Sequence, residues 1–118
     1  MNGNSRKLSR AALSAIRRSE RNDGLAISVI TLVELARLIA SNRIEPMGSM
    51  EQTLGKLVAG MAILPISLEI AAYTTHFPLD FPSDPADRII AATARVEGVP
   101  LITADERILR CPLLKTIW

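Results

Sequence analysis

The stretch 84–109, DPADRIIAATARVEGVPLITADERIL, decides the fold because it holds a helix and a strand with clear boundaries. Asp84 can accept hydrogen bonds from free N–H groups at a helix start, and Pro85 at the first helical position gives up no hydrogen bond. Gly98 ends this helix. Residues 99–103 (VPLIT) then predict a strand, and residues 104–109 (ADERIL) a short helical turn. The stretch therefore predicts the helix and strand alternation of an α/β protein.

The same alternation continues on both sides of this stretch. Before it we expect a helix capped by Ser9 and stopped by Asn22-Asp23-Gly24, then a buried strand at 25–30 (LAISVI). A second helix opens at Thr31 and ends near Ser41-Asn42, and a third is expected over Met50, Leu54, Leu57 and Val58. A short apolar run at 62–66 (AILPI), a helix capped by Ser67 and a proline-rich loop at 76–84 follow. Residues 115–118 form the last expected strand. The pattern predicts one domain over 1–118, with a mostly parallel sheet covered on both faces.

Composition narrows the classes of function. Hydrophobic residues make up 48% of the 118 and charged residues 22%, which predicts a folded chain. No apolar run approaches the roughly 20 residues that span a bilayer, and polar residues follow Met1, so we expect a cytoplasmic protein without a membrane segment. Cys111 and His76 are the only cysteine and histidine, which excludes an internal disulfide and a Cys/His zinc site. A metal here must be bound by oxygen.

Positive charge is concentrated near the amino terminus although the net charge is only +2. The residues concerned are Arg6, Lys7, Arg10, Arg17, Arg18 and Arg21. This bias suggests a polyanionic partner, but a solvated helix face explains a charge run of this kind slightly better.

Three acidic residues are placed to reach one edge of the expected sheet. Glu34 lies in the first helical turn after the 25–30 strand, Asp87 in the first turn of the helix that Asp84 caps, and Asp105 two residues after the 99–103 strand. Ligand sites of open α/β sheets lie at the carboxyl ends of the strands. Carboxylates brought together there repel one another and raise one another's pKa unless a cation neutralises them. We therefore expect a divalent metal site.

Such a site favours phosphodiester chemistry. Mg²⁺, or Mn²⁺ in its place, prefers oxygen ligands and leaves room for water and substrate phosphate. The ion would deprotonate water for in-line attack on phosphorus and stabilise the leaving oxygen. The sequence has no GxSxG or Walker glycine pattern, so serine-hydrolase and P-loop functions have no support.

Each acid also has a purely structural interpretation. Thr31 to Glu34 reads as a capping box, and taken alone Glu34 fits the cap better than a catalytic role. Asp87 complements the helix dipole three residues after Asp84, and alone the two interpretations are nearly even. Asp105 starts a short helix, where acids are common. The recurrence of all three at one sheet edge favours the metal site, because capping does not require it.

Four stretches resemble successive motifs of the PIN-domain family, VapC-type toxins in particular. They are ISVITLVELARL (27–38), LPISLEIA (64–71), DPADRIIAATA (84–94) and PLITADERI (100–108), which together cover essentially the whole chain. The pair of DPADRIIAATA and LITADERI is the most specific. The resemblance implies an α/β/α sandwich, commonly a homodimer, whose acidic Mg²⁺ site cleaves RNA and which a cognate VapB-type antitoxin inhibits.

The resemblance also assigns residues. The family's helix glutamate corresponds to Glu34 and its two later aspartates to Asp87 and Asp105. Thr103 matches a small hydroxyl residue often near the metal, and Asp84 is shared by the DPADR subgroup, where capping is its expected role. Arg88 is a candidate phosphate contact, with an exposed helix arginine as the default.

The sequence departs from the family at its start. Family members open with an apolar strand that ends in an aspartate, whereas here Met1 leads almost directly into LSRAALSAI (8–16). We therefore expect a PIN-like sheet without its first strand, which removes one metal ligand and exposes the edges of neighbouring strands. Either the true start codon lies upstream or the gene is a truncated copy, and the intact later motifs favour the first. Three functions remain open. The first is an active Mg²⁺ ribonuclease, with activity on DNA or structured RNA also possible. The second is an inactive protein that still binds antitoxin, and the third, least favoured, is an unrelated α/β metal or phosphoacceptor domain.

Overall fold

Helices and strands alternate along most of the chain, as expected. The computed structural model describes residues 9–21 and 24–118. Its helices are α1 (Arg10–Arg21), α2 (Val29–Ala40), α3 (Met50–Leu57), α4 (Leu68–Tyr73), α5 (Pro85–Glu97) and α6 (Glu106–Leu109). Its strands are β1 (Ala26–Ser28), β2 (Ala62–Leu64), β3 (Leu101–Ile102) and β4 (Thr116–Ile117). The stop expected at Asn22-Asp23 lies outside the described residues.

Helix caps were the most predictable feature. The Ser9 hydroxyl accepts a hydrogen bond from Ala12 N at 3.0 Å and the Ser67 hydroxyl one from Ile70 N at 3.1 Å. Asp84 accepts from Ala86 N at 2.9 Å, and Gly98 ends α5 with a left-handed φ of 69°. Each of these side chains or backbones satisfies groups that the helix ends leave without an internal partner.

The boundary between β1 and α2 differs from the expectation. The run 25–30 was expected to be a buried strand, but β1 ends at Ser28, and of its three residues only Ser28 is buried. Ser28 is the N-cap of α2 and accepts a hydrogen bond from Ile30 N at 3.3 Å, so the helix begins at Val29 instead of Thr31. The serine supplies a capping oxygen that overrides the strand preference of the β-branched Val29 and Ile30.

The strand pairs are parallel, but they do not join into one central sheet. β1 pairs with β2 in the register Ala26↔Ala62, and β3 pairs with β4 in the register Leu101↔Thr116. Within residues 9–21 and 24–118 these pairs form separate two-stranded sheets. The expectation that an opening strand is lacking concerns the start of the chain, and residues 1–8 lie outside the described part.

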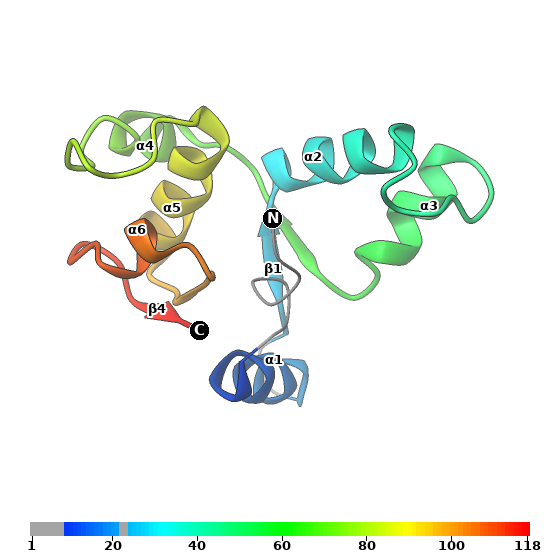
Figure 1. Cartoon of the computed structure of the whole chain (residues 1–118), viewed down its shortest axis with the longest axis horizontal. Helices are drawn as coiled ribbons and strands as arrows, with labels where there is room; N and C mark the ends of the chain where they lie inside the picture. The colour runs from blue at the N-terminus through cyan, green and yellow to red at the C-terminus, as the bar shows by residue number, and fades with distance from the viewer. Residues whose placement is uncertain (1–8, 22–23) are drawn as a thin grey trace.

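The best-packed region surrounds α5. Its buried residues come from α4, the loop before α5, α5 itself and the α6 region: Ile70, Phe77, Phe81, Ala91, Ala92, Ile108 and Cys111. Figure 1 shows these helices on one side of β1, with α2 and α3 on the other. α5 also contacts both α2 and β1, so it connects the two sides.

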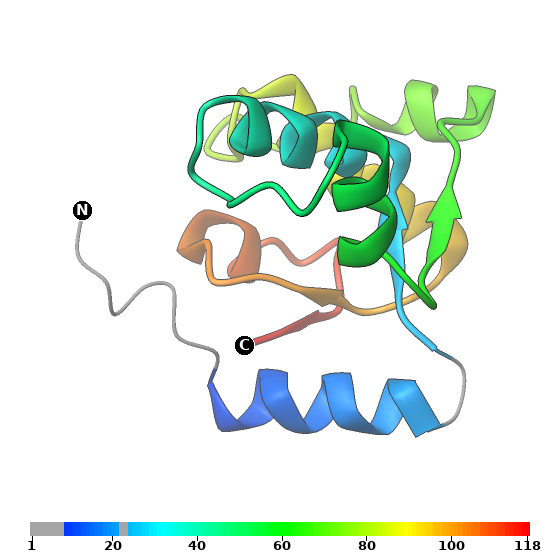
Figure 2. The same cartoon turned by 90° about the vertical axis from the view of Figure 1, so that its right-hand side faces the viewer.

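Helix α1 lies at the opposite end of the molecule from the start of α2 (Figure 2). Ala12 and Ala15 are buried, and the helix contacts β4. Among the residues that the structure describes, no helix has both the length and the apolar character needed to cross a membrane.

Candidate metal and phosphodiester site

Glu34 lies in the second turn of α2, one turn deeper than expected. Because α2 begins at Val29 and Ser28 is its N-cap, Glu34 has no part in a capping box with Thr31. Its side chain is half-buried, and α2 packs against both β1 and α5. The structural interpretation that fitted Glu34 best is therefore wrong, and its burial beside α5 needs another explanation.

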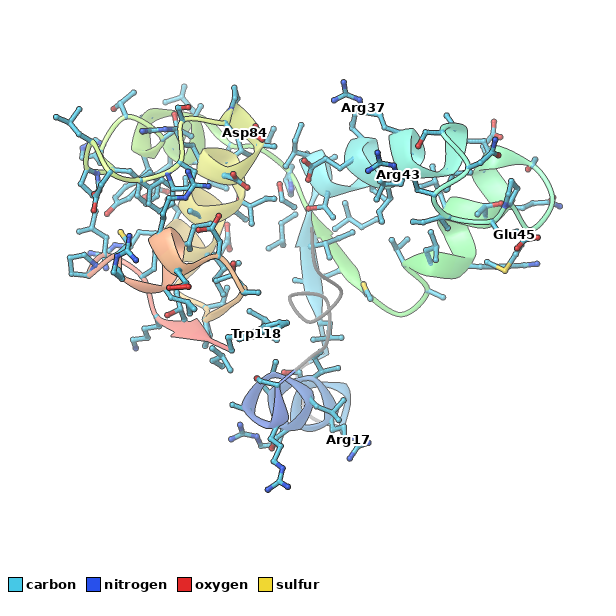
Figure 3. The ribbon with its side chains drawn as sticks, viewed as in Figure 1. Arg17, Arg37, Arg43, Glu45, Asp84 and Trp118 are labelled. Atoms are coloured by element: carbon cyan, nitrogen blue, oxygen red, sulfur yellow. The ribbon has the colours of Figure 1, made fainter. Side chains whose placement is uncertain are left out.

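Asp84 and Asp87 both lie at the start of α5, but their surroundings differ. Asp84 is exposed and caps the helix through its hydrogen bond from Ala86 N. Asp87, in the first turn, is half-buried and accepts no hydrogen bond from the residues that the structure describes. Figure 3 shows Asp84 at the end of α5 nearest to α2. Asp84 thus has a capping role, whereas the Asp87 carboxylate is available to a ligand.

Asp105 is fixed by several hydrogen bonds. It is the N-cap of α6 and its Oδ1 accepts from Arg107 N at 2.8 Å. Its Oδ2 forms an ion pair with Arg107 Nη2 at 3.1 Å, and its own backbone N donates to Thr103 Oγ1 at 3.1 Å. Thr103 therefore positions the backbone of Asp105, and the capping interpretation of Asp105 holds alongside any other role.

The acidic residues at the start of α5 are electrostatically coupled to Glu34 and to Asp105. Burial raises the pKa of the Glu34 carboxyl above its ordinary value of 4.5, and the charges of Asp84 and Asp87 raise it further against the opposing effect of Arg37. Burial likewise raises the pKa of Asp87 above 3.8, with added contributions from Asp84 and Asp105. Asp87 at the start of α5 is therefore the carboxylate that is coupled both to Glu34 on α2 and to Asp105 before α6.

Asp105 differs from the other two in the sign of its shift. Burial alone would raise its pKa, but the hydrogen bonds and charge of Arg107, with a backbone hydrogen bond from Ile108, lower it below the ordinary 3.8. Arg107 thus keeps Asp105 ionised. This role of Arg107 could not be read from the sequence, because an arginine two residues after an aspartate is common on exposed helices.

The donor chemistry of this cluster fits a hard divalent ion. Within residues 9–21 and 24–118, no group of three or more Asp, Glu, His or Cys side chains is arranged as a ready metal cage. Mg²⁺ does not need one, because it keeps several waters and is commonly bound by one or two carboxylates together with substrate phosphate. Two half-buried carboxylates with raised pKa, Glu34 and Asp87, are the residues that suit it best.

Arg88 is engaged within the protein. Its Nε donates to Pro82 O at 2.9 Å and its Nη1 to Thr74 O at 3.2 Å, while the guanidinium lies 5.8 Å from the centre of the Phe81 ring. The side chain is half-buried instead of exposed. These contacts hold the proline-rich loop against α5, so Arg88 stabilises the segment that carries Asp84.

Comparisons with known proteins agree with the motifs. A family model described as PIN domain matches residues 3–112. The chain is 40% identical to Ribonuclease VapC22 of Mycobacterium tuberculosis (strain ATCC 25618 / H37Rv) in an alignment of 117 residues, which covers 95% of this chain and 85% of that protein. A chain of the VapBC2 structure from Rickettsia felis, bound to a DNA fragment from their promoter, has a similar fold, with a TM-score of 0.69 at 19% identity and coverage of 92% of this chain and 84% of that one. The chain therefore belongs to the PIN-domain family as a VapC-type member, which confirms the family that its motifs predicted.

Proposed function

We propose that this chain is a divalent-metal-dependent endoribonuclease, the toxin of a toxin–antitoxin pair. Family membership and the 40% identity to a VapC ribonuclease support this function. The observation that carries it is the position of Asp87 at the start of α5, half-buried beside α2 and electrostatically coupled to Glu34 on α2 and to Asp105 before α6. Helix capping accounts for Asp105 but not for Glu34, and Asp87 lies in the first turn of α5, where its charge also complements the helix dipole.

The residues have different roles in the proposed reaction. A bound Mg²⁺ or Mn²⁺ supplies a polarised phosphate and a more acidic water. Glu34 and Asp87 hold the ion, which relieves the repulsion that raises their pKa. Asp105, kept ionised by Arg107, accepts a hydrogen bond from the attacking water and orients it. The water oxygen would bond to phosphorus as its proton passes to solvent, and the bond to the leaving sugar oxygen would break as solvent supplies a proton to that oxygen.

Partners follow from the same assignment. We infer that a VapB-type antitoxin binds the chain and blocks this site, and that the chain acts as a homodimer. Support for the antitoxin comes from the VapC-type membership, and the Rickettsia felis structure is of a VapBC protein.

The test is RNA cleavage by matched variants. Wild-type protein, Asp87→Asn, Glu34→Gln and Glu97→Gln are incubated with end-labelled RNA in Mg²⁺ or in EDTA. Asp87→Asn and Glu34→Gln should lower the rate on the order of a hundredfold or more, since each removes a metal ligand. Glu97→Gln is the control, because Glu97 is exposed at the far end of the same helix. Cleavage that persists in EDTA would contradict the proposal.

A second function has a specific observation in its favour. Because the described residues hold no ready cage of three metal ligands, and Arg107 already neutralises Asp105, the chain could bind antitoxin without cleaving RNA. Wild-type protein that binds a VapB-type antitoxin but leaves RNA intact in Mg²⁺ and in Mn²⁺ would establish this alternative.

A further inference from the structure

Helix α1 has one face of arginines and one buried face. Arg10, Arg17 and Arg18 are exposed, whereas Ala12 and Ala15 are buried. At about 100° per residue, the three arginines project to one side of the helix and the two alanines to the other. We call the set of Arg10, Arg17 and Arg18 the arginine face. The alanine side anchors the helix to the protein and leaves the arginine face directed to solvent.

The arginine face forms no ion pair with the side chains that the structure describes. Glu20 is the one acid in the sequence of α1, and no ion pair joins Arg10, Arg17 or Arg18 to a side chain that the structure describes. Figure 3 shows Arg17 pointing away from the rest of the molecule. Because like charges on neighbouring turns repel, such a face is favourable mainly when a polyanion covers it.

The chemistry of the face suits phosphates better than a protein surface. Ser14 is exposed between the arginines along the helix, and Leu13, which is 36% exposed, lies to one side. Protein interfaces are built around a desolvated apolar centre, which this face lacks. Guanidinium groups bind phosphate oxygens in a two-pronged manner. Arg10 and Arg17 are roughly 10 Å apart along the axis, about three nucleotides of a helical strand.

The position of the face determines which RNA can use it. α1 lies at the end of the molecule opposite to the start of α2 and Asp84 (Figures 1 and 3), and the molecule measures 41 × 34 × 32 Å. An RNA that touches both places must extend over a large part of the protein. An RNA of about three nucleotides, which rises roughly 10 Å as a stacked strand, is too short to do so.

We propose that the arginine face binds the phosphate backbone of the RNA substrate at a distance from the point of cleavage. This inference rests on the proposed ribonuclease function for its choice of RNA. It defines the substrate class as a long or folded RNA that is held at two places. A short single-stranded RNA reaches only the acidic site and gains nothing from α1.

Binding and cleavage are measured separately, so that the two proposals can fail independently. Binding uses the Asp87→Asn protein, which should not cut, and a labelled RNA hairpin of about 30 nucleotides, with fluorescence anisotropy at 50 to 200 mM salt. The test variant carries Arg10→Gln, Arg17→Gln and Arg18→Gln. The control carries Arg43→Gln, Lys56→Gln and Arg110→Gln, three exposed cations elsewhere, and has the same net charge.

The salt dependence gives the expected size of the effect. Three phosphate contacts contribute about 2 to 3 to the slope of log Kd against log salt. Between 50 and 200 mM salt, the RNA affinity of the Asp87→Asn protein with its three arginines intact should therefore fall roughly twenty- to fortyfold more than that of the test variant. The control should keep the larger slope. In proteins with Asp87 intact, the arginine substitutions should lower kcat/KM for the hairpin but not for an RNA of about three nucleotides.

Three results would overturn the inference. One is an equal loss of slope in test and control variants, which would reflect net charge alone. Another is unchanged RNA binding together with lost antitoxin binding in the test variant, which would assign the face to a protein partner. The third is an equal loss of cleavage on short and long RNA. If the wild type cuts no RNA yet the slope difference is found, the arginine face stands and the ribonuclease proposal fails.

Discussion

The two sides of β1 are built differently. On the side of α4, α5 and α6, a continuous apolar cluster includes Ile70, Phe77 and Phe81. The rings of the two phenylalanines stack, with 4.3 Å between their centroids. On the side of α2 and α3, Ile39 is buried, and Thr53 is held by hydrogen bonds to Met47 N at 2.8 Å and Ser49 O at 2.9 Å. One side is held by packing and the other largely by caps and local hydrogen bonds.

The acidic site draws on both sides. Glu34 comes from α2, whereas Asp84, Asp87 and Asp105 come from the α5 side. The helices α2 and α5 are in contact, so the distance between these carboxylates depends on how the two sides meet. A well-packed half thus fixes three acids, and a more weakly packed half brings the fourth. Metal and RNA bound between them would also hold the sides together.

The largest expected difference is in the cost of losing a core side chain. Ile70→Ala, at a fully buried position of α4, should lower the free energy of unfolding by about 2–5 kcal/mol, because it leaves a cavity in the packed side. Ile63→Ala on β2 should cost about 1 kcal/mol or less, since Ile63 is 41% exposed. Urea unfolding of both variants measures the difference. Similar losses would show that the two sides are packed alike.

A medium-sized effect is expected at the helix caps. Ser28→Ala removes the N-cap of α2 and Ser67→Ala that of α4, and each should cost about 1 kcal/mol of unfolding free energy. Only Ser28→Ala should also weaken RNA cleavage, because α2 carries Glu34. Urea unfolding and cleavage assays on the same proteins check this. An equal loss of cleavage in both variants would mean that the site depends on overall stability.

The smallest effect, in the pH dependence of stability, separates the acids by sign. Glu34 and Asp87 have raised pKa values, so the folded chain binds more protons than the unfolded chain between the ordinary carboxyl pKa and the raised one. Stability should therefore fall as pH rises through this window. Asp105, with its lowered pKa, should lose its contribution as pH falls below its ordinary 3.8.

Thermal unfolding from pH 3 to 7 checks these signs. Glu34→Gln and Asp87→Asn should flatten the fall in stability above the ordinary carboxyl range, and Asp105→Asn should reduce the loss in acid. Glu97→Gln is again the control. A steeper fall with rising pH in Asp87→Asn than in the wild type would contradict the repulsion between these carboxylates.

Local features were predictable from the sequence, whereas contacts between distant segments were not. Ser67, Asp84-Pro85 and Gly98 marked their helix ends correctly because capping depends on neighbouring residues alone. The run 25–30 was misjudged because Val29 and Ile30 suit a strand and a buried helix equally. Parallel pairing followed from the alternation of elements, but the division into two sheets did not.

The candidate site was partly predictable for the same reason. Position after a strand identified Glu34 and Asp105, and position in the first turn of a helix identified Asp87. The electrostatic coupling of Asp87 to the other two is consistent with that choice. Sequence spacing could not show that Ser28 caps α2, which frees Glu34, or that Arg107 holds Asp105. It also could not show that Arg88 is taken up by Pro82 and Thr74, since these contacts arise only from folding.

Direct Mn²⁺ binding tests the central claim, that carboxylates from both sides of β1 form a divalent-ion site. Free Mn²⁺ is followed by electron paramagnetic resonance as it is titrated into wild type, Glu34→Gln, Asp87→Asn and Glu97→Gln. We predict one class of bound ion that is weakened on the order of tenfold or more by either of the first two substitutions and unchanged in Glu97→Gln. Binding that survives both Glu34→Gln and Asp87→Asn would contradict the account.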